Sequence, residues 1–125
     1  SYWLNPKAEY FVCNRILRDS FYRECWKPGE IEEHTIFVGN GYSPLKGLHF
    51  VIDALALLVK EFPDAKVYVS GDCPIIEGGK PSLRKYTYGR ILKNKISDYG
   101  LQKNVVFIGS LNGDDMIARM KKSNV

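Results

Sequence analysis

With 125 residues, the chain is about one domain long and can bury a single core. Hydrophobic residues make up 45% of it and charged residues 26%, a balance that argues against global disorder. The net charge of +4 is only mildly basic, and no recognised nucleic-acid module accompanies it, so nucleic acid is excluded as an expected partner.

The N-terminal part of the chain has two interpretations. Tyr10–Cys13 favours a short strand, followed by a helix from Arg15 to about Cys25 that Asn14 would cap. One continuous helix over residues 7–25 is the alternative, because the apolar run is too short for its periodicity to decide. Residues 26–33 are expected to form a turn or linker. The three cysteines are an odd number without paired metal spacing, which favours reduced thiols in a cytoplasmic protein.

Strands and helices alternate from residue 34 onward. Strands are predicted at residues 34–39, 66–71 and 104–109, and helices at residues 47–62, 87–99 and 115–122, the last capped by Asn112 or Asp114. Residues 72–86 are expected to form a loop, and a further strand is expected to begin at residues 123–125. Strands spaced by ~30 or more residues, with helices between them, predict βαβ units and a parallel sheet. Phe37 and Val106 are expected to be fully buried within it.

Glycines close each of the three predicted strands, at Gly39, Gly71 and Gly109. Right-handed crossovers place the carboxyl ends of parallel strands at the same rim of the sheet, and open parallel sheets bind their ligands there. Gly39-Asn40-Gly41 is not a dinucleotide fingerprint, since Pro44 stands where its third glycine would be.

Lys46 lies where the first of these strands gives way to a helix. A lysine at a helix start opposes the helix dipole at a cost of a few tenths of a kcal/mol to ~1 kcal/mol. An anion held between Lys46 and the helix amides would offset that cost, so we predict a phosphate-binding site. In the alternative interpretation, Gly39 and Gly41 only permit a tight turn, and Lys46 is an ordinary surface lysine.

Other polar residues indicate no chemistry. His34 and His49 have no obvious partner, and Asp53 is expected to face solvent or cap a loop. No metal site and no hydrolytic triad is recognisable. Two basic clusters are expected to be solvated helix surfaces, with contact to anionic lipid as the alternative; they comprise Arg84, Lys85, Arg90, Lys93 and Lys95, and Arg119, Lys121 and Lys122.

From Glu33 to its end, the sequence resembles the C-terminal nucleotide-sugar-binding domain of a family 4 glycosyltransferase, which has the GT-B fold. The segments that carry the resemblance are Thr35-Ile-Phe-Val-Gly, Lys46-Gly47-Leu48, Asp53-Ala54-Leu55, residues 62–71, Tyr99-Gly100-Leu101, residues 104–109 and residues 116–124. The resemblance implies an α/β fold, with a Rossmann-like parallel sheet and flanking helices. It also implies that residues 33–125 form part of a donor-binding domain and that residues 1–32 are a linker or the end of a preceding acceptor domain.

By this resemblance, Lys46 contacts the donor diphosphate, and Asn40-Gly41 occupies the place of the arginine that usually assists it. Ser110 and Leu111, directly after Gly109, would meet the nucleotide base, with Gly39 and Gly71 on the same rim. The paired-glutamate segment that grips the donor sugar would lie beyond Val125, so this piece of a larger protein is expected to be inactive alone.

The implied reaction is a metal-independent, retaining transfer of a sugar from a nucleoside diphosphate sugar, without a further cofactor, in glycan or polysaccharide biosynthesis. A glycan or lipid-linked acceptor would bind through the other domain. The expected location is the cytoplasm, with peripheral contact at the inner face of the membrane and a homodimer of the fragment as further expectations. The alternative is a non-enzymatic, flavodoxin-like nucleotide- or phosphate-binding module. An oxidoreductase or epimerase is disfavoured by Pro44.

Overall fold

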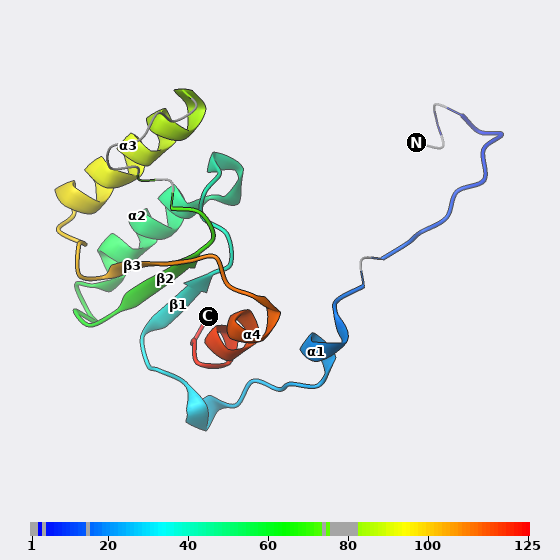
Figure 1. Ribbon diagram of the computed structural model, residues 1–125. Helices are drawn as coiled ribbons and strands as arrows, with labels where there is room; N and C mark the ends of the chain where they lie inside the picture. Colours follow the sequence, from blue (N-terminus) through cyan, green and yellow to red (C-terminus); the bar gives the residue numbers. More distant parts are fainter. Residues whose placement is uncertain (1–2, 4, 15, 74, 76–82) are drawn as a thin grey trace.

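The computed structural model describes residue 3 and residues 5–14, 16–73, 75 and 83–125. In these residues one sheet contains three parallel strands in the order β1-β2-β3: β1 (Thr35–Val38), β2 (Lys66–Ser70) and β3 (Val105–Gly109). Helices α2 (Leu48–Leu58) and α3 (Leu83–Asp98) cover one face of the sheet, and α4 (Gly113–Lys121) lies on the other (Figure 1). The predicted Rossmann-like α/β fold is therefore confirmed.

The hydrophobic core lies between the sheet and the pair α2 and α3. Because side chains alternate along a strand, Val67 and Val69 of β2 point to this face together with Val105 of β3. All three are buried, and they pack against apolar residues from the two helices: Leu48, Ile52, Leu55, Tyr88, Leu92 and Ile96. The apolar residues of α2 that face the sheet thus form part of this core.

Phe37 and Val106 are only half-buried, so the prediction that both are fully buried is wrong. The register pairs both residues with Tyr68, which places all three side chains on the face that α4 covers. A single helix of nine residues cannot cover that face as fully as α2 and α3 cover the other. The sequence shows that these strands are apolar, but it does not show how many helices lie on each side.

The N-terminal part contains less regular structure than either interpretation predicts. In the described residues up to residue 25, neither the strand at residues 10–13 nor a helix over residues 7–25 or 15–25 is present. The helical residues in this part are those of α1 (Asp19–Tyr22). A short 3₁₀ helix, η1 (Pro28–Glu30), follows in the expected linker. The residues before α1 extend away from the sheet (Figure 1), so no packed layer supports their local preferences.

Several other boundaries differ from prediction: α2 ends at Leu58, four residues before the predicted end, and α4 begins at Gly113, two residues before the predicted start. Helix α3 begins at Leu83, four residues before the predicted start, and much of the expected loop before it, residues 74 and 76–82, lies outside the described residues. A second 3₁₀ helix, η2 (Pro44–Lys46), precedes α2. For α4, the structure selects Asn112 as the cap, because its Oδ1 accepts a hydrogen bond of 2.9 Å from the backbone N–H of Asp115.

After α4 the chain returns to the outer edge of β1. The backbone N–H of Asn124 donates to the carbonyl of Thr35 (3.0 Å), and the N–H of Phe37 donates to the carbonyl of Val125 (2.7 Å). A parallel bridge also joins Glu32 to Ser123. The helices that follow β1 and β2 therefore lie on one face, whereas the helix after β3 lies on the other and leads back beside β1.

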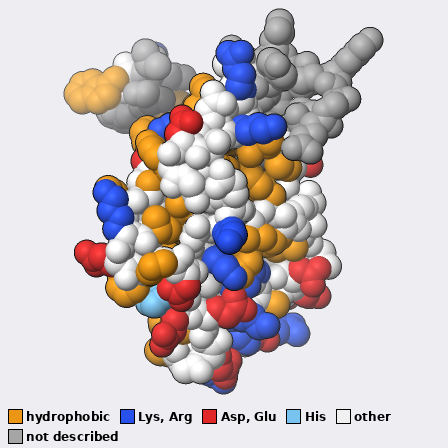
Figure 2. Space-filling view, turned by 90° about the vertical axis from the view of Figure 1, so that its left-hand side faces the viewer, with side chains coloured by type: hydrophobic (Ala, Val, Ile, Leu, Met, Phe, Trp, Pro, Cys, Tyr) orange, Lys and Arg blue, Asp and Glu red, His pale blue; other side chains and the backbone are white. Residues whose placement is uncertain are grey.

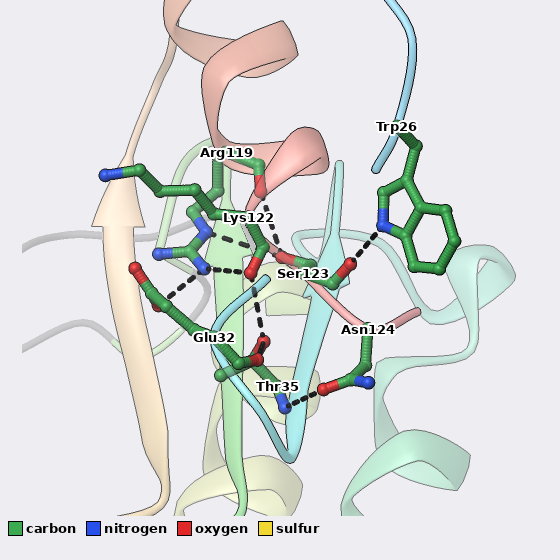
Figure 3. Close-up of polar contacts among 7 residues, drawn as sticks. All are labelled: Trp26, Glu32, Thr35, Arg119, Lys122, Ser123 and Asn124. Carbon is green, nitrogen blue, oxygen red and sulfur yellow. Dashed lines mark hydrogen bonds and ion pairs between the residues drawn. The ribbon is translucent and has the colours of Figure 1, made fainter. Parts of the chain in front are cut away.

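A polar cluster holds this return in place (Figure 3). The guanidinium of Arg119 binds the carboxylate of Glu32 at 2.7 Å and stacks over the ring of Tyr68, 4.1 Å from its centroid. The indole N–H of Trp26 donates to the carbonyl of Ser123 at 2.9 Å. The cluster thereby ties the segment before β1 to the C-terminal end of α4.

Candidate functional site

The carboxyl ends of the three strands meet at one rim, as the glycine pattern predicts. The backbone N–H of Gly71, after β2, donates to the carbonyl of Gly109 at 2.9 Å. The hydroxyl of Ser70 donates to the carbonyl of Gly39 at 2.7 Å, which ties the end of β2 to the end of β1. Gly71 and Gly109 have positive φ angles of 93° and 73°, a conformation that favours glycine.

The turn after β1 is packed tightly onto this rim. The side-chain oxygen of Asn40 accepts a hydrogen bond from the backbone N–H of Tyr42 at 3.3 Å, which closes the turn. A Cβ on Gly71 would lie 3.4 Å from the same Asn40 oxygen, so the Asn40 side chain lies against Gly71. The Asn40 residue is exposed, and its amide nitrogen donates no hydrogen bond to a described residue. That nitrogen is therefore available to a ligand.

Gly41 is buried, and its described contacts are structural. Its backbone N–H donates to the carbonyl of Ser70 at 3.4 Å. A Cβ at this position would lie 2.8 Å from Cδ2 of Leu48 and closer still to Cγ1 of Val69. Gly41 thus allows the turn to approach the core directly. Its predicted contact with a diphosphate remains a prediction.

Lys46 ends η2, at the junction with α2. Its backbone N–H donates to the carbonyl of Ser43 at 2.9 Å, and Gly47 then adopts a positive φ of 75° as the N-cap of α2. The Lys46 side chain is exposed and forms no ion pair with a described residue. Among the residues that the structure describes, this cation at the start of α2 therefore has no ion-pair partner, and the approach of its ammonium to the rim remains a prediction.

A tyrosine from α3 lies at the N-terminal end of α2. Tyr88 is 4% exposed, and its hydroxyl is 3.3 Å from Nδ1 of His49. Burial raises the pKa of Tyr88, and the adjacent backbone N–H groups of His49 and Leu48 partly oppose that rise. A buried hydroxyl thus lies at the helix end on which the predicted phosphate site depends, and Lys46 and Asn40 remain the candidates for contact with an anion.

Sequence reasoning missed this tyrosine as part of the site. Tyr88 falls on the apolar stripe of α3, and that pattern alone predicts only that it is buried. A buried tyrosine hydroxyl usually has a hydrogen-bond partner, and this requirement was the available signal. The polar residue that meets this requirement is His49, at the helix end that faces Tyr88.

Ser110 and Leu111 directly follow β3 at the same rim. Ser110 is exposed and Leu111 is half-buried, and Asn112 then begins α4. Their backbone therefore lies next to Gly109, as expected, while contact with a nucleotide base stays a prediction.

Comparison with protein families identifies the chain. The family model described as glycosyl transferases group 1 matches residues 22–125. The chain belongs to this family. No curated protein and no solved structure matches it. The Rossmann-like sheet of this group 1 glycosyltransferase is accordingly a fragment of a GT-B domain.

Two residues of the second basic cluster of the glycosyltransferase chain, Arg119 and Lys121, form internal ion pairs. Besides the contact of Arg119 with Glu32, the ammonium of Lys121 lies 2.6 Å from a carboxylate oxygen of Glu24. These hydrogen bonds hold the pKa of both glutamates below its ordinary value. Around the end of the molecule where the strands begin, acidic and basic side chains are interspersed over the lower half of the view (Figure 2). The expectation of a solvated helix surface is not met for Arg119 and Lys121, whose side chains are only 14% and 31% exposed.

The remaining polar residues singled out from the sequence have structural partners. The Nδ1 atom of His34 lies 3.1 Å from both carboxylate oxygens of Asp64. Asp53 does not simply face solvent: one of its oxygens contacts the Lys95 ammonium at 2.5 Å and accepts a hydrogen bond from the Tyr99 hydroxyl at 3.0 Å. Among the described residues, no helix is long and apolar enough to cross a membrane.

Proposed function

We propose that this group 1 glycosyltransferase chain carries the donor-binding half of a retaining family 4 enzyme, which transfers a sugar from a nucleoside diphosphate sugar. The observation that carries the proposal is the reversal of winding at β1. The helices after β1 and β2 lie on one face, and α4 leads to the outer edge of β1 from the other face. In open α/β sheets, ligands bind outside the carboxyl ends of the strands at such a reversal. The loop that begins at Gly39 and ends at Lys46 lies there.

The proposed chemistry depends on charge at this loop. When the glycosidic bond to the donor breaks, negative charge develops on the leaving diphosphate. The Lys46 ammonium would stabilise that charge, and the amide nitrogen of Asn40 would donate a hydrogen bond in place of the usual arginine. No metal takes part in the proposed step. Gly39, Gly71, Gly109, Ser110 and Leu111 would form the rim against the nucleotide.

The wider assignment rests on the same resemblance. Catalytic glutamates and the acceptor domain are proposed to lie outside the 125 residues, with the division between domains near residue 32. The acceptor would be a glycan or a lipid-linked glycan, and the pathway polysaccharide or glycan biosynthesis in the cytoplasm. We expect no sugar transfer by this chain alone, and measurable transfer from common nucleotide sugars would contradict that expectation.

The direct test is a calorimetric titration of the chain with UDP, GDP and ADP. Lys46→Ala should weaken binding of the preferred nucleotide roughly tenfold, because a charge-assisted phosphate contact contributes more than a neutral one. Lys60→Ala is the matched control, since Lys60 is also exposed but follows the other end of α2, about 16 Å away along the helix axis. Equal affinity of wild type and Lys46→Ala would remove the lysine from the site.

A further inference from the structure

The first turn of α2 has no side-chain cap at its N-cap residue, and the hydroxyl of Tyr88 contacts a side chain of this turn. Backbone N–H groups in the first turn of a helix have no partner within the helix, and a side-chain oxygen commonly accepts from them. In α2 the N-cap residue is Gly47, which has no side chain to offer. The N–H groups of Phe50 and Val51 donate to the carbonyl of Gly47 at 2.9 and 3.3 Å. The preceding two amides belong to Leu48 and His49, and the side chain of His49 meets the hydroxyl of Tyr88 at 3.3 Å.

The hydroxyl of Tyr88 is joined to this turn through the side chain of His49. A tyrosine hydroxyl can donate or accept a hydrogen bond. It lies 3.3 Å from Nδ1 of His49, and the tautomer of the imidazole determines which of the two groups donates. The rings of Tyr88 and His49 also meet edge to face, with centroids 5.8 Å apart and an interplanar angle of 89°. Because Tyr88 belongs to α3, these contacts tie the first turn of α2 to a different element.

The first turn of α2 is connected directly to the proposed donor loop, which ends at Lys46. Lys46 precedes Leu48 by two residues, and the backbone amides of Lys46 and Gly47 are already bonded within η2. Leu48 is fully buried, and it is also one of the two side chains against which Gly41 packs. Fixing the first turn of α2 therefore fixes the backbone on which Lys46 stands.

We propose that Tyr88 is a positioning residue for nucleotide binding, which acts by holding the η2–α2 junction so that Lys46 stays directed toward the donor diphosphate. This inference rests on the proposed function. It assigns Tyr88 no contact with the ligand. Burial raises the pKa of the Tyr88 hydroxyl, so the group stays protonated near neutral pH. The proposal therefore predicts that the effect of Tyr88 on affinity depends on Lys46.

A double-mutant cycle with UDP, GDP and ADP tests this dependence. Tyr88→Phe should lower the affinity for the preferred nucleotide about 3- to 10-fold in the wild-type background, and less than about twofold when Lys46 is already alanine. Tyr99→Phe is the matched control, because it removes another tyrosine hydroxyl of the α2–α3 contact, the one that donates to Asp53, and should leave affinity unchanged.

The outcomes separate the two proposals. If Lys46→Ala does not weaken binding, or no nucleotide binds, the proposed function fails. If Lys46→Ala weakens binding but Tyr88→Phe has no effect, or the same effect in both backgrounds, the positioning role fails. Hydrogen exchange gives a readout without ligand: Tyr88→Phe should accelerate exchange of the Leu48 and His49 amides, and unchanged exchange would overturn the inference.

Discussion

Gly41→Ala should destabilise the protein by about 1–3 kcal/mol, because one added methyl group would overlap the core. The new Cβ would lie 2.8 Å from Cδ2 of Leu48 and closer to Cγ1 of Val69. Leu48 is fully buried and Val69 is 1% exposed, so neither side chain can move into solvent to make room. Close-packed interiors resist such overlap, since relief requires off-rotamer side chains or a backbone shift. The turn itself would have to lift away from the rim.

Gly39→Ala provides the matched control, two residues earlier in the same turn. There a Cβ would meet only Cε1 of Phe37, at the ordinary contact distance of 4.0 Å, and the residue is exposed. Because alanine restricts the unfolded chain more than glycine does, Gly39→Ala should be neutral or stabilising by up to about 1 kcal/mol. Urea unfolding followed by circular dichroism measures both variants. If Gly41→Ala loses no more stability than Gly39→Ala, the argument from packing at the rim is refuted.

Three further results are expected from unfolding experiments on the same chain. Arg119→Met should cost about 2–3 kcal/mol, because it removes both a charged hydrogen bond and the stacking on an aromatic ring, whereas Lys121→Met should cost much less because its ion pair is exposed; equal losses would contradict this. Val67→Ala should destabilise more than Val106→Ala, since only the first valine is fully buried, and the reverse order would contradict the unequal coverage of the two faces. The hydrogen bond from Arg119 lowers the pKa of Glu32 below its ordinary value of 4.5. The contribution of this ion pair to stability is therefore present above pH 4.5 and is lost as the pH falls through the lowered pKa. Glu32→Gln should flatten the acid side of the curve of stability against pH, and an unchanged slope would exclude this cause.

The sheet was predictable because its signals are local. Short β-branched runs, each closed by glycine and separated by long amphipathic segments, determine both the strands and their parallel direction. Burial of particular residues was less predictable. The same alternation that places Val67 inside places Phe37 and Val106 on the other face, and only the three-dimensional path of α4 determines how well that face is covered. The N-terminal preferences failed for a related reason, since a strand-forming run such as Tyr10–Cys13 becomes a strand only beside another strand.

Parts of the candidate site could likewise be predicted from the sequence, and other parts could not. The meeting of Gly39, Gly71 and Gly109 at one rim follows from topology, and the sequence predicts it. The contact between Tyr88 and the first turn of α2 joins residues 39 positions apart, and no spacing rule predicts it. A ligand role for Lys46 could be proposed from its place before a helix. The residues that surround it in the structure could not be predicted from the sequence.

The unequal layers on the two sides of the sheet imply that the molecule opens in stages. The side formed by α2 and α3 holds nearly all of the fully buried apolar surface, while α4 contributes one buried apolar residue, Ile117, beside the polar cluster around Arg119 and a few backbone bonds to β1. Detachment of α4 should therefore require less free energy than global unfolding, and amides of α4 should exchange with solvent deuterium earlier than those of β2. Heat or denaturant would then loosen the outer edge of β1 first, while the glycine rim and the turn that contains Gly41 persist until the final cooperative transition.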